Sequence, residues 1–387
     1  MLSTSLLESL SRLPSPLLTA YVRTTPDEAS LQGAAPRYLH FLKEAGRSAA
    51  ESLASEEREA FSKQLERVTE FLSRPKSHGS LVIFAGSSVW EVVPLQVAVK
   101  DELWWGKPSL GQLVWLAGEH KQCGIIVVDH KGARFFHYSL GEIVEGAEKK
   151  FAIDISGWRQ KDLGHVASEG MAITHGTQRD VFDKRVDSQY VRLCRETAQH
   201  AATFFSPKEL AAIFVVGPDK LTALIEAKFP RSLRLPIVRI DHDLARLTPH
   251  ELLEHLEPRI ADWERQHQSA LVNAITGNDR GTIRGFDETL TQLQWGQVRT
   301  LVLARDFDPV VRECLQCSST DRNSDNLCPV CGAGRRAVTL REALPELLLK
   351  HQTGLEIVSG EAAERLKQIG GIAAWIRRKK VTAKAAG

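Results

Sequence analysis

Four of the six cysteines in the 387-residue sequence lie in one short stretch, CLQCSSTDRNSDNLCPVCG, at residues 314 to 332. They form two Cys-x-x-Cys pairs, Cys314 with Cys317 and Cys328 with Cys331, and ten residues separate the pairs. Two such pairs can close on one ion and give the tetrahedral thiolate site that Zn²⁺ accepts. Gly332, directly after the second pair, relaxes the backbone where thiolates and N–H groups converge. The spacing therefore predicts a structural zinc site.

Two other interpretations of the same pairs remain open, a degenerate site that has lost its metal and a redox pair. In a reducing compartment, paired Cys-x-x-Cys motifs indicate metal more often than disulfide. No catalytic carboxylate or fifth ligand stands nearby, which favours a structural ion over a catalytic one. The two remaining cysteines, Cys123 and Cys194, have apolar sequence neighbours and are predicted to be buried thiols.

Other patterns that could do chemistry are weak. The sequence has no Walker loop, no Gly-x-Gly-x-x-Gly and no Gly-x-Ser-x-Gly. Asp241 and Asp243 flank His242 after a predicted strand, which could indicate a metal or acid–base site, but a solvated turn is the simpler interpretation.

Positive charge is local. The net charge of +2 gives no global argument for nucleic-acid binding. The segment IRRKKVTAK, residues 376 to 384, holds five positive charges and no acidic residue. It is either a solubilising tail or a phosphate-binding tail that touches RNA, to which Arg335 and Arg336 could add.

The N-terminus, MLSTSLLESLSRL, has no basic region before an apolar core and is typical of an amphipathic helix. No run approaches the roughly 18 apolar residues that a membrane span needs. We therefore expect a cytoplasmic protein without a membrane partner.

The elements that must position these residues divide into three α/β domains. Residues 1–119 are predicted to hold strands at 17–23, 80–86 and 89–95, and two helices between 36 and 73. Four tryptophans cluster before residue 120 and are predicted to pack in the core: Trp90, Trp104, Trp105 and Trp115.

Residues 120–276 form the predicted middle domain. Buried strands are expected at 125–128, in AAIFVVG and in PIVRI, with a further strand in ARFFHYSL. A polar stretch without periodicity runs from Ser156 to about Arg179, and a helical pattern begins at Phe182. Thr248, Pro249 and Glu251 predict a capped helix that runs to about Ile275.

Residues 277–387 form the predicted C-terminal domain. After a Gly-rich linker at 277–285 come a helix in DETLTQLQWGQ and a strand in VRTLVLA. The zinc-binding minidomain, 312–338, is an insertion. A helix (LREALPELLLKHQ), a strand (LEIVSG) and AAERLKQIGGIAAWIRR follow, so helices pack against a sheet.

This order of motifs is recognisable. TLTQLQWGQVRTLVLA, the two cysteine pairs, LEIVSG and IGGIAAWIRR together resemble the C-terminal domain of archaeo-eukaryotic class-one peptide release factors, and GIIVVDHKGARFF resembles the start of their middle domain. The chain resembles a bacterial branch of this release factor and Pelota superfamily. The resemblance covers roughly residues 120 to 380. It implies an L7Ae-like ribosomal-protein fold for the C-terminal domain, with an inserted zinc-binding minidomain.

The resemblance also implies a catalytic site. The family's middle domain carries a Gly-Gly-Gln loop before a helix with a Tyr-Val-Arg element. In THGTQRDVFDKRVDSQYVR, the loop triplet falls on Gly176, Thr177 and Gln178, and the helix element on 189–192. Such a triplet would assist water in hydrolysing peptidyl-tRNA, with a backbone N–H as an oxyanion donor. Thr177 departs from the pattern, and an ordinary polar surface loop is the alternative.

The implied setting is the ribosomal A site, with rRNA and tRNA as partners of a monomeric factor that a translational GTPase such as elongation factor Tu could deliver. The RNA-binding candidates are Arg179, Lys184, Arg185, Arg377, Arg378, Lys379 and Lys380. Asn-Ile-Lys-Ser and Tyr-x-Cys-x-x-x-Phe, which read stop codons in the family, are absent from residues 1–119. We expect codon-independent peptide release or rescue of stalled ribosomes. The alternative is a non-catalytic Pelota-like or hibernation-like factor that only binds.

Overall fold

The computed structural model describes residues 4–25, 36–74, 79–152, 176–205, 210–233, 235–277 and 281–377. The chain forms two compact units. The first joins residues 1–120 to 259–387, and the second spans 121–258. The described residues form a mixed α/β fold with four separate sheets, so the predicted fold class is confirmed at this level.

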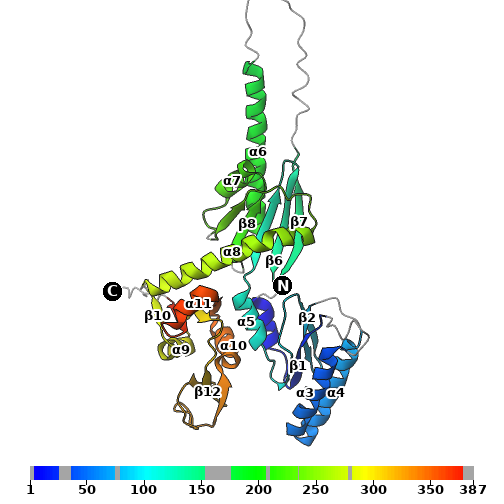
Figure 1. Cartoon of the computed structure of the whole chain (residues 1–387), viewed down its shortest axis with the longest axis vertical. Coiled ribbons are helices and arrows are strands. Elements are labelled where there is room, and N and C mark those ends of the chain that lie inside the picture. Colours follow the sequence, from blue (N-terminus) through cyan, green and yellow to red (C-terminus); the bar gives the residue numbers. More distant parts are fainter. Residues whose placement is uncertain are drawn as a thin grey trace, which may run out of the picture. The chain divides into compact units, whose positions relative to one another are not determined.

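The N-terminal part of the first unit is an antiparallel sheet in the order β3-β2-β1-β4 (Figure 1). Alternate strand residues such as Leu18, Ala20 and Ile83 are buried against two helices, whose Leu42 and Phe61 are fully covered. The elements are α1 (Thr4–Ser11), β1 (Leu17–Arg23), α3 (Arg37–Ser52), α4 (Ser55–Leu72), β2 (Ser80–Ala85), β3 (Trp90–Leu95) and β4 (Glu102–Gly106).

The predicted strands and helices of this part are confirmed, and β4 is an addition. Two of the clustered tryptophans lie on β4. Trp105 packs edge-on against Phe61 in the core, whereas Trp104 is 42% exposed. Trp90 lies on β3 beside Phe71. The prediction that all four tryptophans are core residues is therefore wrong for Trp104, because alternate residues of an edge strand face opposite sides of the sheet.

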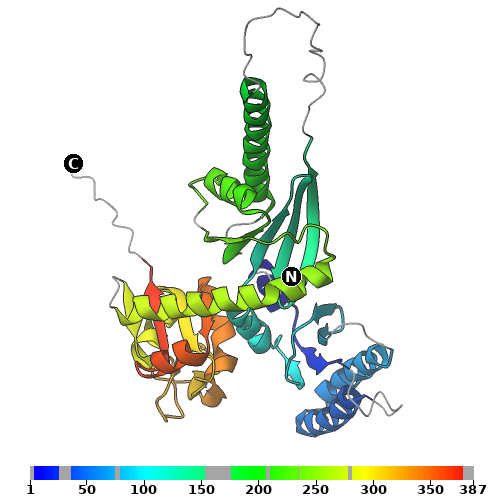
Figure 2. The same ribbon diagram turned by 45° about the horizontal axis from the view of Figure 1, so that its top comes forward.

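The second unit contains a five-stranded sheet (Figure 2). Its strands lie in the order β7-β6-β5-β8-β9. β5, β8 and β9 are parallel, and β6 and β7 continue the sheet as antiparallel strands. β7 was not predicted, because its run of charged residues hides the alternation expected of a strand. The strands are β5 (Cys123–Val128), β6 (Gly132–Ser139), β7 (Glu142–Lys150), β8 (Ala212–Val216) and β9 (Ile237–Ile240).

Two helices cover one face of this sheet, α6 (Gly176–Phe204) and α7 (Asp219–Lys228). Their buried residues Cys194, Ala198 and Ile225 pack with Ile126 and Phe135 of the strands. Cys123 and Cys194 are both buried, as predicted. Burial raises the pKa of the Cys194 thiol to about 11, so this cysteine stays protonated near neutral pH.

Helix α8 (Pro249–Thr276) starts with the predicted capping box. The Thr248 N–H donates to Glu251 Oε2 at 2.9 Å, and the Glu251 N–H donates back to Thr248 Oγ1 at 3.4 Å. The boundary between the two units falls after Pro258, inside this helix.

The C-terminal part of the first unit is built on a sheet in the order β10-β16-β11-β15. β11 and β15 are parallel, and β16 is antiparallel to β11 and β10. The strand β10 lies inside the segment predicted as a linker. The elements are β10 (Thr282–Arg284), α9 (Phe286–Gln294), β11 (Val298–Ala304), α10 (Leu340–His351), β15 (Gly354–Val358), α11 (Gly360–Lys367) and β16 (Ile372–Ile376).

Helices cover both faces of this sheet. Val302 and Val358 pack with Val272 of α8 and Leu366 of α11. On the other face, α5 (Gly111–Glu119) lies so close to β15 that a Cβ on Gly118 would meet Leu355 at 2.8 Å and Ile357 at 2.9 Å.

In the part of the chain that the structure describes, no helix combines the length and apolarity needed to cross a membrane.

Candidate functional site

The four clustered cysteines belong to a small three-stranded antiparallel sheet, which we call the minidomain. Its strands are β12 (Val310–Cys314), β13 (Thr320–Asp321) and β14 (Arg335–Thr339), in the order β13-β12-β14. The first cysteine pair begins at the end of β12, and the second follows in the segment that leads to β14. The long insertion thus returns on itself and brings the two pairs together.

The four sulfur atoms converge on one point. All lie within 4.8 Å of one another. Cys314 Sγ is 3.4 Å from Cys331 Sγ, and Cys317 Sγ is 3.6 Å from Cys328 Sγ and 3.5 Å from Cys331 Sγ. These separations exclude disulfide bonds, which need about 2.05 Å. Four thiolates at about 2.3 Å from one ion would lie about 3.8 Å apart, so the donor set fits a tetrahedral metal ion.

The two cysteine pairs adopt the same turn. In the first, the Cys314 N–H donates to Ser319 O at 2.9 Å, and the Ser318 N–H donates to Cys314 O at 3.1 Å. In the second, the Cys328 N–H donates to Ala333 O at 2.8 Å, and the Gly332 N–H donates to Cys328 O at 2.9 Å.

Each turn requires a left-handed residue directly after its second cysteine. Ser318 has φ 57° and Gly332 has φ 74°. The role predicted for Gly332 is therefore backed by its geometry. Ser318 takes the same conformation although it is not glycine, and no sequence pattern indicates this.

Backbone N–H groups point at the sulfur atoms. Cys317 and Gln316 donate their N–H groups to Cys314 Sγ, both at 3.4 Å, and Val330 donates to Cys328 Sγ at 3.4 Å. Hydrogen bonding from the Cys317 N–H in particular lowers the pKa of Cys314 to about 6. These donors stabilise the thiolate form, which is the form that binds metal.

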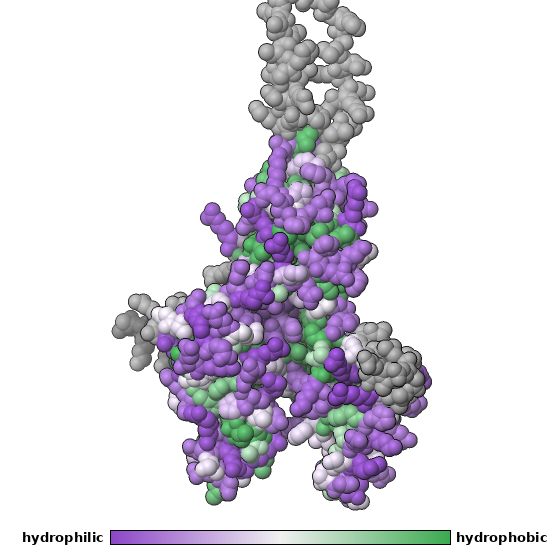
Figure 3. All heavy atoms as spheres, viewed as in Figure 1, coloured by the Kyte–Doolittle hydropathy of each residue, from purple (hydrophilic) through white to green (hydrophobic). Residues whose placement is uncertain are grey.

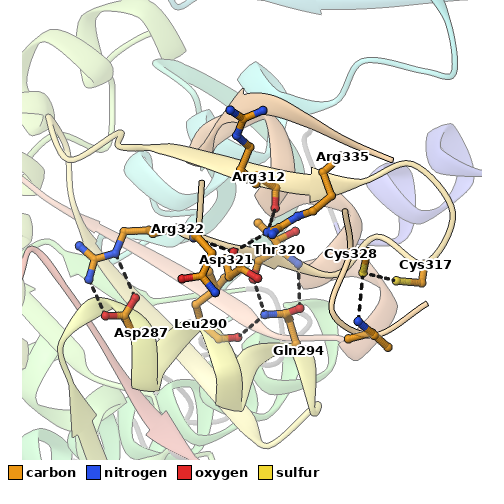
Figure 4. A network of polar contacts seen from close by, with 12 residues as sticks. Asp287, Leu290, Gln294, Arg312, Cys317, Thr320, Asp321, Arg322, Cys328 and Arg335 are labelled. Atoms are coloured by element: carbon orange, nitrogen blue, oxygen red, sulfur yellow. Dashed lines mark hydrogen bonds and ion pairs between the residues drawn. The ribbon is translucent and has the colours of Figure 1, made fainter. Parts of the chain in front are cut away.

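Polar contacts fasten the minidomain to helix α9 (Figure 4). The amide of Gln294 donates to Thr320 O at 2.7 Å and accepts from the Thr320 N–H at 2.9 Å. Arg322 donates to both carboxylate oxygens of Asp287, at 3.0 and 2.5 Å. Gln294 and Arg322 were not predicted as site residues, because only the folded chain brings α9 beside β13.

Arg335 is not free to contact phosphate, contrary to prediction, and Arg336 already pairs with a carboxylate although its side chain is half-exposed. The Arg335 side chain is fully buried, pairs with Asp321, and donates to Arg312 O at 3.0 Å. Arg336 donates to Glu313 Oε2 at 2.7 Å. Both arginines lie on β14, where the antiparallel pairing with β12 places acceptors next to them.

The predicted catalytic triplet lies at the start of α6. Gly176, Thr177 and Gln178 are the first three residues of this helix, which begins six residues before the predicted start at Phe182. No glycine or proline follows Gln178 until the helix ends, so nothing in the sequence stops the helix from extending upstream. The side chains of 176–185, including those of Arg179, Lys184 and Arg185, lie outside what the structure describes.

The predicted helix element at 189–192 faces the sheet of the second unit. Tyr190 OH lies 3.2 Å from His130 Nδ1, and the two rings meet edge to face. Desolvation raises the pKa of Tyr190. Arg192 lies 3.9 Å from Glu196 on the same helix. The polar stretch from Ser156 to His175 lies outside the described residues.

The basic tail begins at a well-fixed residue. The guanidinium of Arg377 donates to three carbonyls, Val298 O at 3.0 Å, His351 O at 2.5 Å and Gln352 O at 3.0 Å. Arg378, Lys379 and Lys380 lie outside the described residues. Asp241, His242 and Asp243 are all exposed, in agreement with a solvated turn.

Part of the chain matches a known protein family. Residues 108–260 match the profile of bacterial archaeo-eukaryotic release factor family 10. Over this segment the chain is similar to bacterial members of the archaeo-eukaryotic release factor superfamily. The matched segment contains the whole second unit and helix α5. Gly176–Gln178 and the element at 189–192 therefore lie within the part of the chain that carries the family's signature.

Solved structures that resemble this chain come from archaea and yeast. The archaeal translation termination factor aRF1 is 13% identical over 96% of each chain, with a TM-score of 0.21. Saccharomyces cerevisiae Dom34, a translation termination-like factor, is 9% identical over 77% of this chain and 80% of its own, with a TM-score of 0.34. Archaeal Pelota, in a ribosome-bound model with ABCE1, is 12% identical over 97% and 94%, with a TM-score of 0.37. No curated protein matches the chain.

Proposed function

We propose that this protein acts in the ribosomal A site and releases the nascent peptide from peptidyl-tRNA on stalled ribosomes, without reading a stop codon. The observation that carries the proposal is the release factor family match over residues 108–260, which encloses the triplet Gly176–Gln178. The absence of the two stop-codon-reading motifs from residues 1–119 supports the codon-independent form.

The proposed reaction is hydrolysis of an ester. The oxygen of water attacks the carbonyl carbon that joins the peptide to the tRNA, the bond to the ribose oxygen breaks, and that oxygen takes up a proton. Gly176, Thr177 and Gln178 belong to the first turn of α6, where backbone N–H groups have no acceptor within the helix. We assign the Gln178 N–H as the donor to the developing oxyanion. Gly176 allows the backbone to approach the reacting centre closely.

The remaining site residues have supporting roles in this proposal. Arg179, Lys184 and Arg185 on α6, and Arg378, Lys379 and Lys380 in the tail, would contact phosphates of rRNA or tRNA. Arg377 fixes the start of the tail through its three carbonyl contacts. The division into domains 1–119, 120–276 and 277–387, and the L7Ae-like fold of the last, stay predictions.

The metal would be Zn²⁺ held by Cys314, Cys317, Cys328 and Cys331. Four thiolates on two matching turns leave no open position for water or substrate, which supports a structural ion. When bound, the ion would order the minidomain, whose small sheet has little apolar core of its own. Delivery by elongation factor Tu stays a prediction. Dom34, among the similar structures, is described as interacting with Hbs1.

A binding factor that does no chemistry is the second candidate, and Thr177 is the observation that favours it. Release factors of this superfamily carry a second glycine in the triplet, and Thr177 brings a β-branched side chain to that place. Thr177 lies in a helical turn, a conformation that such a residue adopts without strain. Threonine in place of the second glycine therefore does not disturb the helix. An activity assay separates the two candidate functions.

The test is release of labelled peptide from purified ribosomes stalled on an mRNA without a stop codon. Gln178→Ala and Gly176→Ala are each expected to lower the release rate by about 100- to 1,000-fold, the usual cost of losing one oxyanion donor or its placement. Thr177→Gly should keep activity. Gln199→Ala, an exposed glutamine on the same helix, is the matched control and should release peptide like the wild type.

Ribosome binding is measured in parallel by sedimentation. If the variants bind normally and fail to release peptide, the hydrolytic proposal stands. A wild type that binds but releases nothing above the ribosome-only background would select the binding factor instead.

A further inference from the structure

An apolar groove lies between the minidomain and the body of the C-terminal part of the first unit. It has a volume of about 430 Å³. Leu290 of α9 and Leu347 of α10 form its floor, both largely buried. Trp295, at the end of α9, forms one rim, and Val330, between the second pair of cysteines, forms part of the other.

The rim is unusually apolar for a surface. The Trp295 side chain is 66% exposed and Val330 is 72% exposed. Eight large apolar side chains are exposed among the described residues, and five of them belong to the minidomain or this rim: Trp295, Val310, Leu315, Leu327 and Val330. Figure 3 shows apolar residues gathered on the minidomain. Concentrations of exposed apolar side chains mark interaction sites more often than chance.

The charges around the groove favour a protein segment over a polyanion as its occupant. Asp287, Asp321 and Glu346 line the groove, and Lys350 is the cation among its lining residues. Arg322 and Arg335 neutralise the first two carboxylates. The lining has no surplus of positive charge, whereas nucleic acid binding depends on such a surplus. An apolar side chain on a neutral or basic protein segment matches these surroundings.

The groove is also held in shape before any partner arrives. Gln294 bonds to both backbone groups of Thr320, and Arg322 bonds to both oxygens of Asp287, so the two walls cannot separate without breaking four hydrogen bonds. The Arg322 guanidinium also stacks 4.5 Å from the centre of the Phe286 ring. A preformed groove avoids the entropic cost of ordering that a loose one would incur on binding.

We propose that this groove is a docking site for a partner protein, which inserts one or two large apolar side chains from a short neutral or basic segment between Trp295 and Val330. Exposed tryptophans in such positions dominate binding energy at protein interfaces. The ligand class is a peptide segment, and the site is separate from the triplet at the start of α6.

The probe is a phage-displayed library of random 12-residue peptides, selected on the full-length zinc-loaded protein. The expected result is enrichment of peptides that carry large apolar residues and no excess of acidic ones. A synthetic peptide of the selected sequence should bind Trp295→Ser at least about tenfold more weakly than wild type. Trp104→Ser, which removes the exposed tryptophan of β4, is the matched control and should bind like the wild type.

A second variant, Val330→Asp, covers the case in which Trp295→Ser disturbs the fold. Zinc content and circular dichroism check both variants. No enrichment, or selected peptides that bind both variants as tightly as the wild type, would overturn the proposal. So would an oligouridine RNA that binds the wild type and loses its affinity in Trp295→Ser, because the groove would then be a nucleobase site.

Discussion

Ser318 and Gly332 occupy the same place in the two cysteine turns, yet only Gly332 could be recognised in advance. Both residues adopt the left-handed backbone conformation, with φ of 57° for Ser318 and 74° for Gly332. A glycine after a Cys-x-x-Cys pair is a sequence signal for this conformation, whereas serine carries none. The convergence of the four cysteines was predictable from spacing alone. The conformation of Ser318 was not, because it follows from the hydrogen bonds that close the turn.

The first prediction concerns Gly332. A Cβ at this position would meet no atom within 4 Å, so Gly332→Ala tests only the left-handed backbone. Forcing alanine into this conformation costs about 1 kcal/mol, which corresponds to about fivefold weaker zinc binding in a chelator competition. Gly334→Ala is the control, because Gly334 also has open space but no positive φ. Equal zinc affinities of the two variants would contradict the role of backbone strain.

The second prediction concerns Arg134, which joins β6 to two distant segments. Its guanidinium binds both carboxylate oxygens of Glu145, at 2.8 and 2.7 Å, and donates to Leu247 O at 2.8 Å and Ala245 O at 3.2 Å. Arg134→Gln should lower the free energy of unfolding of the second unit by about 1–3 kcal/mol, because partly buried carbonyls lose a charged donor. Urea titration followed by hydrogen exchange of β6 and β7 measures the change.

The same pair gives a pH dependence with a defined sign. The hydrogen bond from Arg134 holds the pKa of Glu145 below its ordinary value. The stabilisation is therefore fully present above the ordinary carboxyl pKa of about 4.3 and is lost as the pH falls through the lower folded-state pKa. The difference in the free energy of unfolding between wild type and Arg134→Gln should therefore become smaller as the pH falls. Arg192→Gln removes an exposed ion pair and serves as the control. It should lower the free energy of unfolding by less than about 0.5 kcal/mol.

At the scale of elements, the sequence predicts the positions of strands better than it predicts which strands pair with each other in a sheet. The strands predicted at 17–23, 80–86 and 125–128 and in VRTLVLA are mostly apolar runs, and the structure has β1, β2, β5 and β11 at these places, with bounds that differ by up to two residues. β7 was missed because its exposed face is charged, and β4 because tryptophans suggested core packing rather than a strand. The pairing of parallel and antiparallel strands in each sheet depends on contacts between distant residues and could not be inferred from local patterns.

For helices too, features that depend on a local motif can be predicted from the sequence, whereas features that depend on contacts between distant residues cannot. The Thr248–Glu251 capping box is a local motif, and both of its hydrogen bonds are present. The sequence predicts that α6 starts at Phe182, because the apolar periodicity that reveals a helix begins only there. In the structure the helix starts at Gly176. The Gln294 contacts that fasten the minidomain to α9 join residues 26 positions apart, and no local pattern signals them.

The third prediction concerns the whole molecule and its metal. The purified protein should contain one zinc ion per chain by elemental analysis, and Cys328→Ser should lower this content. Because the minidomain is an insertion in the first unit, the variant should increase hydrogen exchange in β12, β13 and β14 and leave the second unit unchanged. Cys123→Ala is the control and should retain the zinc. Less than half an equivalent of metal in protein purified without chelator would contradict a zinc site.

At this scale, the proposed function divides between the two units of the chain. Residues 108–260 carry the family match and the triplet, and the cysteine minidomain belongs to the other unit. The proposal therefore assigns chemistry to one unit and partner contacts to the other. The effects of variants of Gln178 and of Trp295 should be independent of each other, because the two residues lie in different units.

The most direct test of the ribosomal role is cryo-electron microscopy of the full-length protein on ribosomes stalled with peptidyl-tRNA in the P site. The expected result is density for the protein in the A site, with the start of α6 next to the 3′ end of the P-site tRNA and Gln178 nearest the ester. Gln178→Ala should bind in the same place. A protein that binds elsewhere on the ribosome, or that occupies the A site with Gly176–Gln178 far from the tRNA 3′ end, would contradict the proposed release activity.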